Sequence, residues 1–290
     1  MFPGCLTALV TPFRDGSVDT KALADLVESQ IAAGVHGLVP CGSTGESATM
    51  SHEEHLTVVR EVVRVARKRV PVVAGTGSNA TSEAIKLTRG AEAAGADAAL
   101  LISPYYNKPT QDGIVQHYAA IADATKIPLI AYNIQGRTAS HITPETMARL
   151  ARIPRLVGVK EASGSMSQAL ETLHACGPDF AVWSGDDVIT LPLMAAGAVG
   201  VISVTSNVAP AKMVALSDAM RAGDLARARR VHAELMPLFH DLFLEINPIP
   251  VKAALAMMGA CSDEIRLPLT KITDKSRAIL ERTLREQGLL

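Results

Sequence analysis

Short apolar runs alternate with helical segments eight times along this chain. Runs of this length and composition suit strands that are buried on both faces of a parallel sheet. Eight successive strand–helix units are the pattern of an α/β fold of the (β/α)8 TIM barrel type. A doubly wound open sheet is the alternative, because the pattern does not show whether the sheet closes. The strand-like runs are 4–10, 37–41, 70–75, 98–103, 128–132, 156–160, 180–184 and 198–204.

The alternation stops after residue 207, and only helical segments follow. Because 48% of the residues are hydrophobic and 20% are charged, the chain has enough apolar surface for a large folded core. We therefore predict a barrel core, residues 1–207, with a C-terminal helical region, residues 208–290, packed beside it. The helical segments of that region lie at about 210–222, 224–243, 250–258 and 274–286.

Charge and cysteine usage argue against several classes of partner. The net charge is −1 without a basic or acidic block, which argues against nucleic acid and against an anionic membrane surface. The longest apolar runs fall short of a membrane span, and no signal peptide is recognisable. Four widely spaced cysteines without a CxxC pair are typical of free thiols in the cytoplasm. The order His52-Glu53-Glu54-His55 is not that of an HExxH zinc site, so we predict no metal.

One lysine ends a strand-like run directly. Lys160 closes the run 156–160 and is followed at once by a Gly/Ser turn. The carboxyl ends of barrel strands are where such enzymes place their chemistry. A lysine in a dry site loses its proton easily, and the neutral amine attacks a ketone to form a Schiff base. The alternative is a solvated lysine just past a strand, which is the commoner situation for a lysine taken alone.

The loops after the other strands carry side chains that suit keto-acid chemistry. Hydroxyls and phenols relay protons, and a guanidinium or backbone amides hold a carboxylate. Each residue has an ordinary structural explanation, but a barrel would bring all of them to one face. They are Ser43 and Thr44 after the second strand, Tyr105 and Tyr106 after the fourth, Tyr132 and Arg137 at the fifth, Gly185 to Asp187 after the seventh, and Ser203 to Asn207 after the eighth.

These residues lie in motifs that resemble the dihydrodipicolinate synthase family, within the N-acetylneuraminate lyase superfamily of class I aldolases. The likeness covers essentially the whole chain. It implies that Lys160 forms a covalent Schiff base with pyruvate, with no metal or organic cofactor. The enamine would then attack L-aspartate-4-semialdehyde, giving 4-hydroxy-tetrahydrodipicolinate in the first committed step of diaminopimelate and lysine biosynthesis. The principal motifs are Gly42-Ser43-Thr44-Gly45-Glu46, Tyr132-Asn133, Gly158-Val159-Lys160-Glu161-Ala162-Ser163-Gly164 and Asn247-Pro248-Ile249-Pro250-Val251-Lys252.

The resemblance also implies roles for individual residues. Ser43, Tyr132 and Tyr106 match a proton relay in which the last tyrosine comes from a neighbouring subunit. A homotetramer built as a dimer of dimers is therefore expected. Substrate-binding positions are Arg137 for the semialdehyde carboxylate, Thr44 for the pyruvate carboxylate, and Gly185 and Ile202 as backbone contributors.

A regulatory site for the effector L-lysine is implied in the same way. The matching positions carry side chains suited to a ligand with both an ammonium and a carboxylate group. Feedback inhibition by lysine is the expectation that follows. The positions are Ala48, His52, His55, Asn79, Glu83 and Tyr105.

Two positions depart from the family pattern. Ser43 replaces a usual threonine, which keeps the hydroxyl but loses the methyl group that stiffens the side chain. Gln135 replaces a common proline in the loop that bears Arg137. Because of these two differences, an alternative function remains open: another pyruvate-dependent aldolase of the superfamily, acting on a sugar acid or a 2-keto-3-deoxy acid. A catalytically silent paralogue with a binding role is a more remote alternative.

Overall fold

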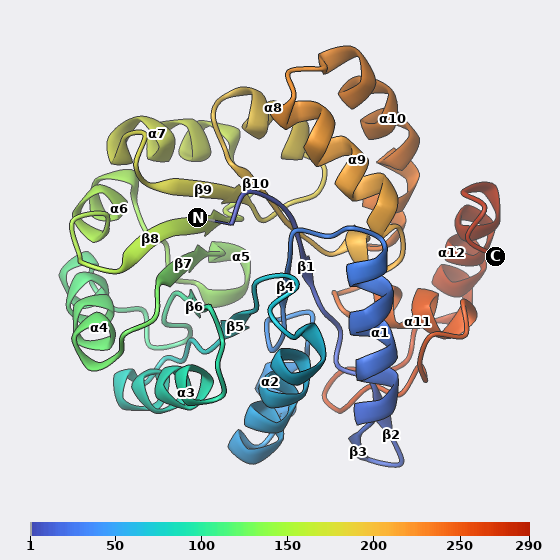
Figure 1. Ribbon diagram of the computed structural model, residues 1–290, viewed down its shortest axis with the longest axis horizontal. Helices are drawn as coiled ribbons and strands as arrows, with labels where there is room; N and C mark the ends of the chain where they lie inside the picture. Colours follow the sequence, from blue (N-terminus) through green and yellow to red (C-terminus); the bar gives the residue numbers. More distant parts are fainter. Residues whose placement is uncertain (1) are drawn as a thin grey trace.

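Eight parallel strands form a closed barrel in the computed structural model, which describes residues 2–290 (Figure 1). They are β1 (Gly4–Ala8), β4 (Gly37–Val39), β5 (Val73–Gly75), β6 (Ala98–Ile102), β7 (Leu129–Asn133), β8 (Leu156–Glu161), β9 (Ala181–Ser184) and β10 (Gly200–Ser203). The order around the sheet is β4-β1-β10-β9-β8-β7-β6-β5. A parallel bridge between Leu38 and Val72 joins the two ends of that order. The predicted (β/α)8 barrel is confirmed, and the open-sheet alternative is wrong.

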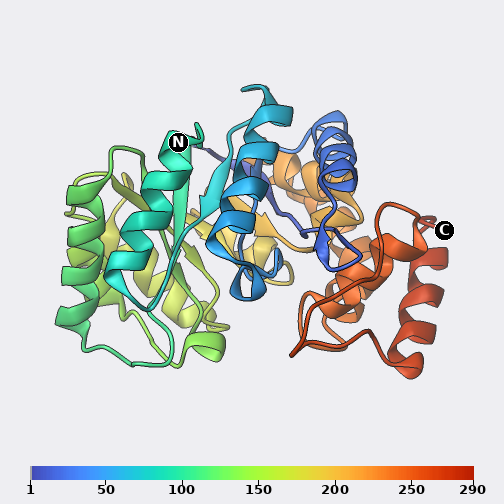
Figure 2. The same ribbon diagram turned by 90° about the horizontal axis from the view of Figure 1, so that it is seen from below.

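Helices surround the barrel as the alternation predicts (Figure 1). The C-terminal helices lie to one side of the barrel, next to α1 and α9 (Figure 2). One hydrophobic cluster nevertheless runs from Leu9 and Leu23 to Leu255 and Leu280, so the division at residue 207 stays a prediction. The surrounding helices are α1 (Thr20–Ala32), α2 (His52–Ala66), α3 (Thr81–Ala93), α4 (Gln111–Ala124), α6 (Pro144–Leu150), α7 (Met166–Cys176), α8 (Thr190–Ala195) and α9 (Pro210–Arg221); the C-terminal ones are α10 (Leu225–Asp241), α11 (Ile249–Met257) and α12 (Asp274–Glu286).

Local sequence signals explain where the long helices begin. The Asp19 carboxylate accepts a hydrogen bond from the backbone N–H of Ala22 and caps α1. Ser51 and Glu54 form a reciprocal capping box at the start of α2. The short elements were not predicted, because one or two turns leave little periodicity in the sequence. They are the hairpin β2 (Phe13–Arg14) and β3 (Ser17–Val18), the 3-10 helices η1 (Ser47–Thr49) and η2 (Thr205–Asn207), and α5 (Gln135–Thr138), which lies in a predicted loop.

Large apolar side chains fill the inside of the barrel. Leu6, Ile130, Trp183 and Ile202 are fully buried there, and the Trp183 indole donates a hydrogen bond to the backbone carbonyl of Phe2. A barrel interior filled with side chains is a packed core and not a pore. The ends of the strands and their loops are therefore where a site can form. No helix within residues 2–290 combines the length and hydropathy needed to cross a membrane.

Replacing Ser51, the N-terminal cap of α2, tests how much this cap contributes to the stability of the fold. Ser51→Ala removes the side chain that accepts from the Glu54 backbone N–H, which should lower the free energy of unfolding by about 1 kcal/mol. Urea unfolding followed by circular dichroism measures the change. Thr57→Ala on the same helix is the control, because its hydroxyl bonds only the Glu53 carbonyl in the helix interior. An equal loss in both variants would contradict the capping explanation.

Candidate active site

Lys160 and Tyr132 are lateral neighbours on adjacent strands. The register of β7 and β8 pairs Tyr132 with Lys160, and paired residues in parallel strands project to the same face. Both side chains are buried, at 5% exposed for Lys160 and 6% for Tyr132. The lysine Nζ atom lies 4.5 Å from the centroid of the tyrosine ring. The strand register therefore places an amine next to a phenol inside the rim of the barrel.

Burial changes the acidity of the Lys160 amine. Removal from water, with a smaller contribution from the positive charge of Arg137, lowers the pKa of Lys160 to about 8. The carboxylate of Asp187 acts in the opposite direction. At neutral pH the amine is therefore unprotonated far more often than a solvated lysine. This is the property that a Schiff-base nucleophile requires.

The phenol of Tyr132 stays protonated at neutral pH. Burial raises the pKa of Tyr132 to about 12, although the Arg137 charge and a hydrogen bond with Ser43 act against the rise. Ser43 belongs to the loop after β4, and both residues line a small cavity beside Gly75 and Thr76. A protonated phenol in contact with a hydroxyl forms a relay that can donate and take back a proton.

Asn247 joins two predicted substrate-binding residues that come from different loops. The guanidinium of Arg137 donates to the backbone carbonyl of Asn247 at 2.8 Å. The side-chain amide of Asn247 in turn donates to the Thr44 hydroxyl at 3.0 Å. Sequence reasoning missed this residue as part of the site, although the motif 247–252 was recognised. Its position in that motif was the available signal.

Gly185, one of the two predicted backbone contributors, lies close to the lysine. A Cβ atom at Gly185 would lie 2.6 Å from the Ala162 Cβ and 3.1 Å from the Lys160 Cε, so a larger residue would displace the lysine. Ile202 is fully buried inside the barrel on β10. Asp187 is predicted from the sequence to lie on the same face of the barrel, but without an individual role. Its carboxylate accepts from the backbone N–H groups of Val204 and Thr205, which fixes the loop after β10.

The structure does not bring Tyr106 together with the other relay residues. Its side chain is 87% exposed and its backbone has a left-handed φ of 72°. The backbone N–H donates to the carbonyl of Thr138, but the side chain lines neither cavity near Lys160. A single chain therefore supplies two of the three predicted relay groups, Ser43 and Tyr132.

Most of the predicted effector residues line one cavity of about 440 Å³ that also reaches Ser43 and Arg137. The His52 ring nitrogen lies 2.6 Å from the Glu83 carboxylate, and a hydrogen bond from Ser78, followed by the contact with His52, lowers the pKa of Glu83. Asn79 does not line the cavity. Its backbone carbonyl accepts from the side chain of Asn107 instead. The predicted residues that do line it are Ala48, His52, His55, Glu83 and Tyr105.

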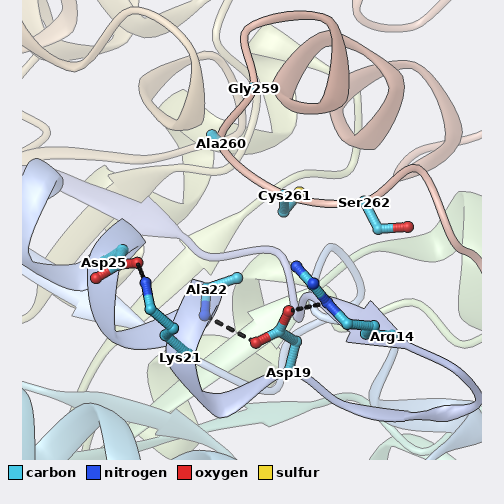
Figure 3. Close-up of a pocket in the computed structure, with 9 residues that line it drawn as sticks. All are labelled: Arg14, Asp19, Lys21, Ala22, Asp25, Gly259, Ala260, Cys261 and Ser262. Atoms are coloured by element: carbon cyan, nitrogen blue, oxygen red, sulfur yellow. Dashed lines mark hydrogen bonds and ion pairs between the residues drawn. The ribbon is translucent and has the colours of Figure 1, made fainter.

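A larger cavity of about 590 Å³ lies elsewhere, between α1 and the loop after α11 (Figure 3). Its charged side chains already pair with one another. Arg14 contacts Asp19 at 2.8 Å and Lys21 contacts Asp25 at 2.7 Å (Figure 3). None of the predicted site residues lines it. The candidate site is therefore the rim around Lys160 and not this cavity.

Comparisons with known proteins agree with this geometry. The dihydrodipicolinate synthetase family matches residues 1–287. A 4-hydroxy-tetrahydrodipicolinate synthase of Syntrophus aciditrophicus is 54% identical over 290 residues, with all of both chains covered. A chloride-inhibited dihydrodipicolinate synthase of Acinetobacter baumannii, solved with pyruvate, is 46% identical with a TM-score of 0.98 and 100% coverage of both chains. The enzyme of Cyanidioschyzon merolae with lysine bound is 40% identical, with a TM-score of 0.96 and coverage of 100% and 99%.

The lowered pKa of Lys160 predicts a pH profile for Schiff-base formation. With pyruvate and borohydride, the initial rate of adduct formation should rise with pH and level off above about 8, because only the neutral amine attacks. Arg137→Met should move the midpoint to higher pH, since the guanidinium charge lowers the lysine pKa. Arg89→Met on α3 is the control and should leave the midpoint unchanged. A wild-type midpoint near 10 would contradict the buried-amine explanation.

Proposed function

This chain belongs to the dihydrodipicolinate synthetase family, and on that premise we propose how its residues perform the reaction of a 4-hydroxy-tetrahydrodipicolinate synthase. The reaction condenses pyruvate with L-aspartate-4-semialdehyde through a Schiff base and needs no separate cofactor. The observation that carries the proposal is the buried Lys160 amine, with its pKa lowered to about 8, beside the protonated phenol of Tyr132.

The first step joins Lys160 to pyruvate. The neutral amine attacks the ketone carbon, and the carbonyl oxygen takes a proton from Tyr132. Loss of that oxygen as water, after a second proton, gives the protonated imine on Lys160. Ser43 passes protons between the phenol and the cavity, because its hydroxyl contacts the phenol. The relay acts in this step as both acid and base.

The pyruvate carboxylate needs donors close to the lysine. Thr44 supplies a hydroxyl that is already oriented by the Asn247 amide, so it can donate its own proton to a carboxylate oxygen. The backbone at Gly185 packs close to the lysine side chain, and Ile202 is a second proposed backbone contributor. These contacts hold the ketone carbon over the amine, which is how binding raises the rate of attack.

The second step forms the new carbon–carbon bond. Loss of a methyl proton from the imine gives an enamine, and its carbon attacks the aldehyde carbon of the second substrate. The resulting alkoxide takes a proton from the relay. The amino group of the second substrate then replaces Lys160 at the imine carbon, which closes the ring and frees the enzyme. Arg137 receives the carboxylate of the semialdehyde, a task that suits its planar fork of donors.

The two departures from the family pattern fit this mechanism. Ser43 keeps the hydroxyl that the relay needs, and ordering its freer side chain costs on the order of 1 kcal/mol at most. Gln135 begins the short helix α5, and its backbone carbonyl accepts from the N–H of Ala139. The Thr138 hydroxyl also donates to the carbonyl of Ser140. A helical turn therefore orders the segment that bears Arg137 without a proline.

A coupled assay tests the proposed reaction directly. Pyruvate and aspartate-4-semialdehyde are supplied with dihydrodipicolinate reductase, which reports the product. Lys160→Ala should abolish turnover, because it removes the amine on which the imine forms. Lys126→Ala, an exposed lysine away from the site, is the control and should keep full activity. A trapped pyruvate adduct on Lys160 without turnover would point to a different aldehyde partner.

The exposed Tyr106 supports an oligomer. Tyr106 is 87% exposed and held at a left-handed φ, a conformation that persists only where contacts enforce it, so its side chain is available for contact with a neighbouring subunit. We therefore propose a homotetramer, a dimer of dimers in which each tight dimer completes two sites. Sedimentation equilibrium together with Tyr106→Phe kinetics tests this assembly.

We also place the reaction in the cytoplasm. All four cysteines are free, and Cys5 and Cys41 are buried. Burial raises the pKa of both thiols, so they are inert packing residues that suit a reducing compartment.

The cavity lined by His52 and Glu83 supports feedback inhibition by L-lysine. Glu83 is held as an anion by Ser78 and His52, so it can pair with an effector's ammonium group. Tyr105 lies at the edge of the same cavity, where it is 38% exposed. A related enzyme solved with lysine bound shares the fold and 40% of the sequence.

Removing the Glu83 charge tests this regulatory site. Millimolar L-lysine should inhibit the wild type, and Glu83→Gln should raise the half-inhibiting concentration by about tenfold or more, because a charge-assisted hydrogen bond is lost. Turnover without lysine is measured alongside. Glu234→Gln on α10 is the control and should leave inhibition unchanged. Activity that lysine does not alter, at either low or saturating pyruvate, would remove the effector site from the proposal.

A further inference from the structure

The loop that carries Ser43 and Thr44 is bounded by two residues with left-handed backbones. Cys41 has a φ of 58° and Glu46 a φ of 54°. Residues other than glycine rarely adopt this conformation, because their Cβ atoms crowd the backbone. Such strain persists only where surrounding contacts enforce it. The contacts that enforce it at Glu46 are therefore contacts that shape the catalytic loop.

Hydrogen bonds between residues close in sequence hold the loop together up to Glu46. The N–H of Glu46 donates to the carbonyl of Ser43 at 3.2 Å, and the N–H of Gly45 donates to the carbonyl of Gly42 at 3.1 Å. The Thr11 hydroxyl donates to the carbonyl of Gly45 at 2.7 Å. A change in the direction of Glu46 would move the two catalytic-loop hydroxyls with it.

The side chain of Glu46 is held by the C-terminal helical region. Its carboxylate accepts from the Lys252 ammonium on α11 at 2.5 Å, and from the backbone N–H of Arg266 at 3.2 Å. Both members of the ion pair are 1% exposed. The two residues are separated by 206 positions in the sequence. A deeply buried ion pair thus joins the catalytic loop to a part of the chain beyond the barrel strands.

Further contacts fix the cation of this pair. The Lys252 ammonium also donates to the carbonyl of Glu264 at 2.5 Å and lies 4.2 Å from the ring centroid of Phe13. The guanidinium of Arg266 lies over the same ring at 4.2 Å and donates to both carboxylate oxygens of Glu54. The charged groups are hydrogen-bonded within the cluster, so its geometry is well determined.

We propose that the Glu46–Lys252 ion pair positions the Ser43 and Thr44 hydroxyls for the reaction at Lys160. Glu46 and Lys252 are positioning residues that act through the loop, and neither lines the small cavity shared by Ser43 and Tyr132. A fully buried ion pair contributes little net stability over apolar groups of the same volume, because desolvation offsets the attraction. Its directional bonds do fix geometry, which is what a relay and a carboxylate contact need.

The inference rests on the proposed Schiff-base function, and its test separates the two. The double variant Glu46→Gln/Lys252→Met removes both charges and nearly keeps the volume, so no unpaired charge remains in the core. Leu235→Ala in the buried face of α10 is the stability control, because it creates a cavity away from the site. All proteins are assayed at a temperature where circular dichroism shows each of them folded.

Two readouts are measured on each protein. One is the pyruvate concentration that half-saturates borohydride trapping on Lys160, which needs no aldehyde substrate. The other is kcat and KM in the coupled assay. For the double variant we expect the half-saturating pyruvate concentration to rise, because Thr44 would no longer be positioned to bind the pyruvate carboxylate. We expect kcat to fall, because the Ser43 hydroxyl would be displaced from the relay. Together these changes should lower kcat/KM by about 10- to 100-fold. Trapping at saturating pyruvate should still be complete, because Lys160 lies on another strand.

Opposite outcomes overturn the inference. A folded double variant with wild-type half-saturation and kcat would make the ion pair purely structural, and so would an equal loss in Leu235→Ala. If the double variant does not fold, the isosteric variant Glu46→Gln is measured in its place. A higher half-saturating pyruvate concentration for trapping would support the inference, and a wild-type value would contradict it. Failure of the wild type to trap pyruvate would instead count against the proposed function.

Discussion

Removing the Lys160 amine from water is the physical constraint on which the rest of the site depends. A lysine becomes a nucleophile near neutral pH only when its charged form is disfavoured, and burial supplies that effect here. Burial needs walls without competing water. The packed interior below the lysine, with Trp183 and Ile202 fully buried, provides them.

The region beyond the barrel strands takes part in the site as well as in the core. Asn247 links Arg137 to Thr44, and Lys252 holds the carboxylate of Glu46 at the base of the same loop. The residues that we propose to bind carboxylates and to relay protons therefore depend on contacts from a late part of the chain. A barrel that folded without these helices would present its catalytic loop without the partners that orient it.

The candidate active site and the proposed effector site lie along one cavity. One cavity runs from Ser43 and Arg137 to the His52–Glu83 contact, so the two regions share a wall. An effector bound there would lie next to the loop that carries the relay hydroxyl. Tyr106, the third predicted relay residue, is exposed and lies apart from Ser43 and Tyr132 within the single chain. The cavity fits the proposed effector site, and the exposed Tyr106 fits the proposed oligomer.

The sequence by itself determined the barrel strands and the long helices, and it indicated Lys160 as the candidate nucleophile. Helix starts at Asp19 and Ser51 follow from hydrogen bonds to residues three positions away, and Lys160 is recognisable because it ends an apolar run. These signals are local, so the chain order contains them. The roles of the individual residues came from a resemblance between motifs, and they stay proposals.

Only the tertiary structure decided what depends on residues far apart in the chain. Closure through Leu38 and Val72, the link that Asn247 makes to Thr44, and the ion pair of Glu46 with Lys252 have no local signal. Two residues separated by about 200 positions meet only after every strand between them has taken its register. The physical reason is that burial and hydrogen-bond partners are properties of the packed whole, and periodicity reports one element at a time.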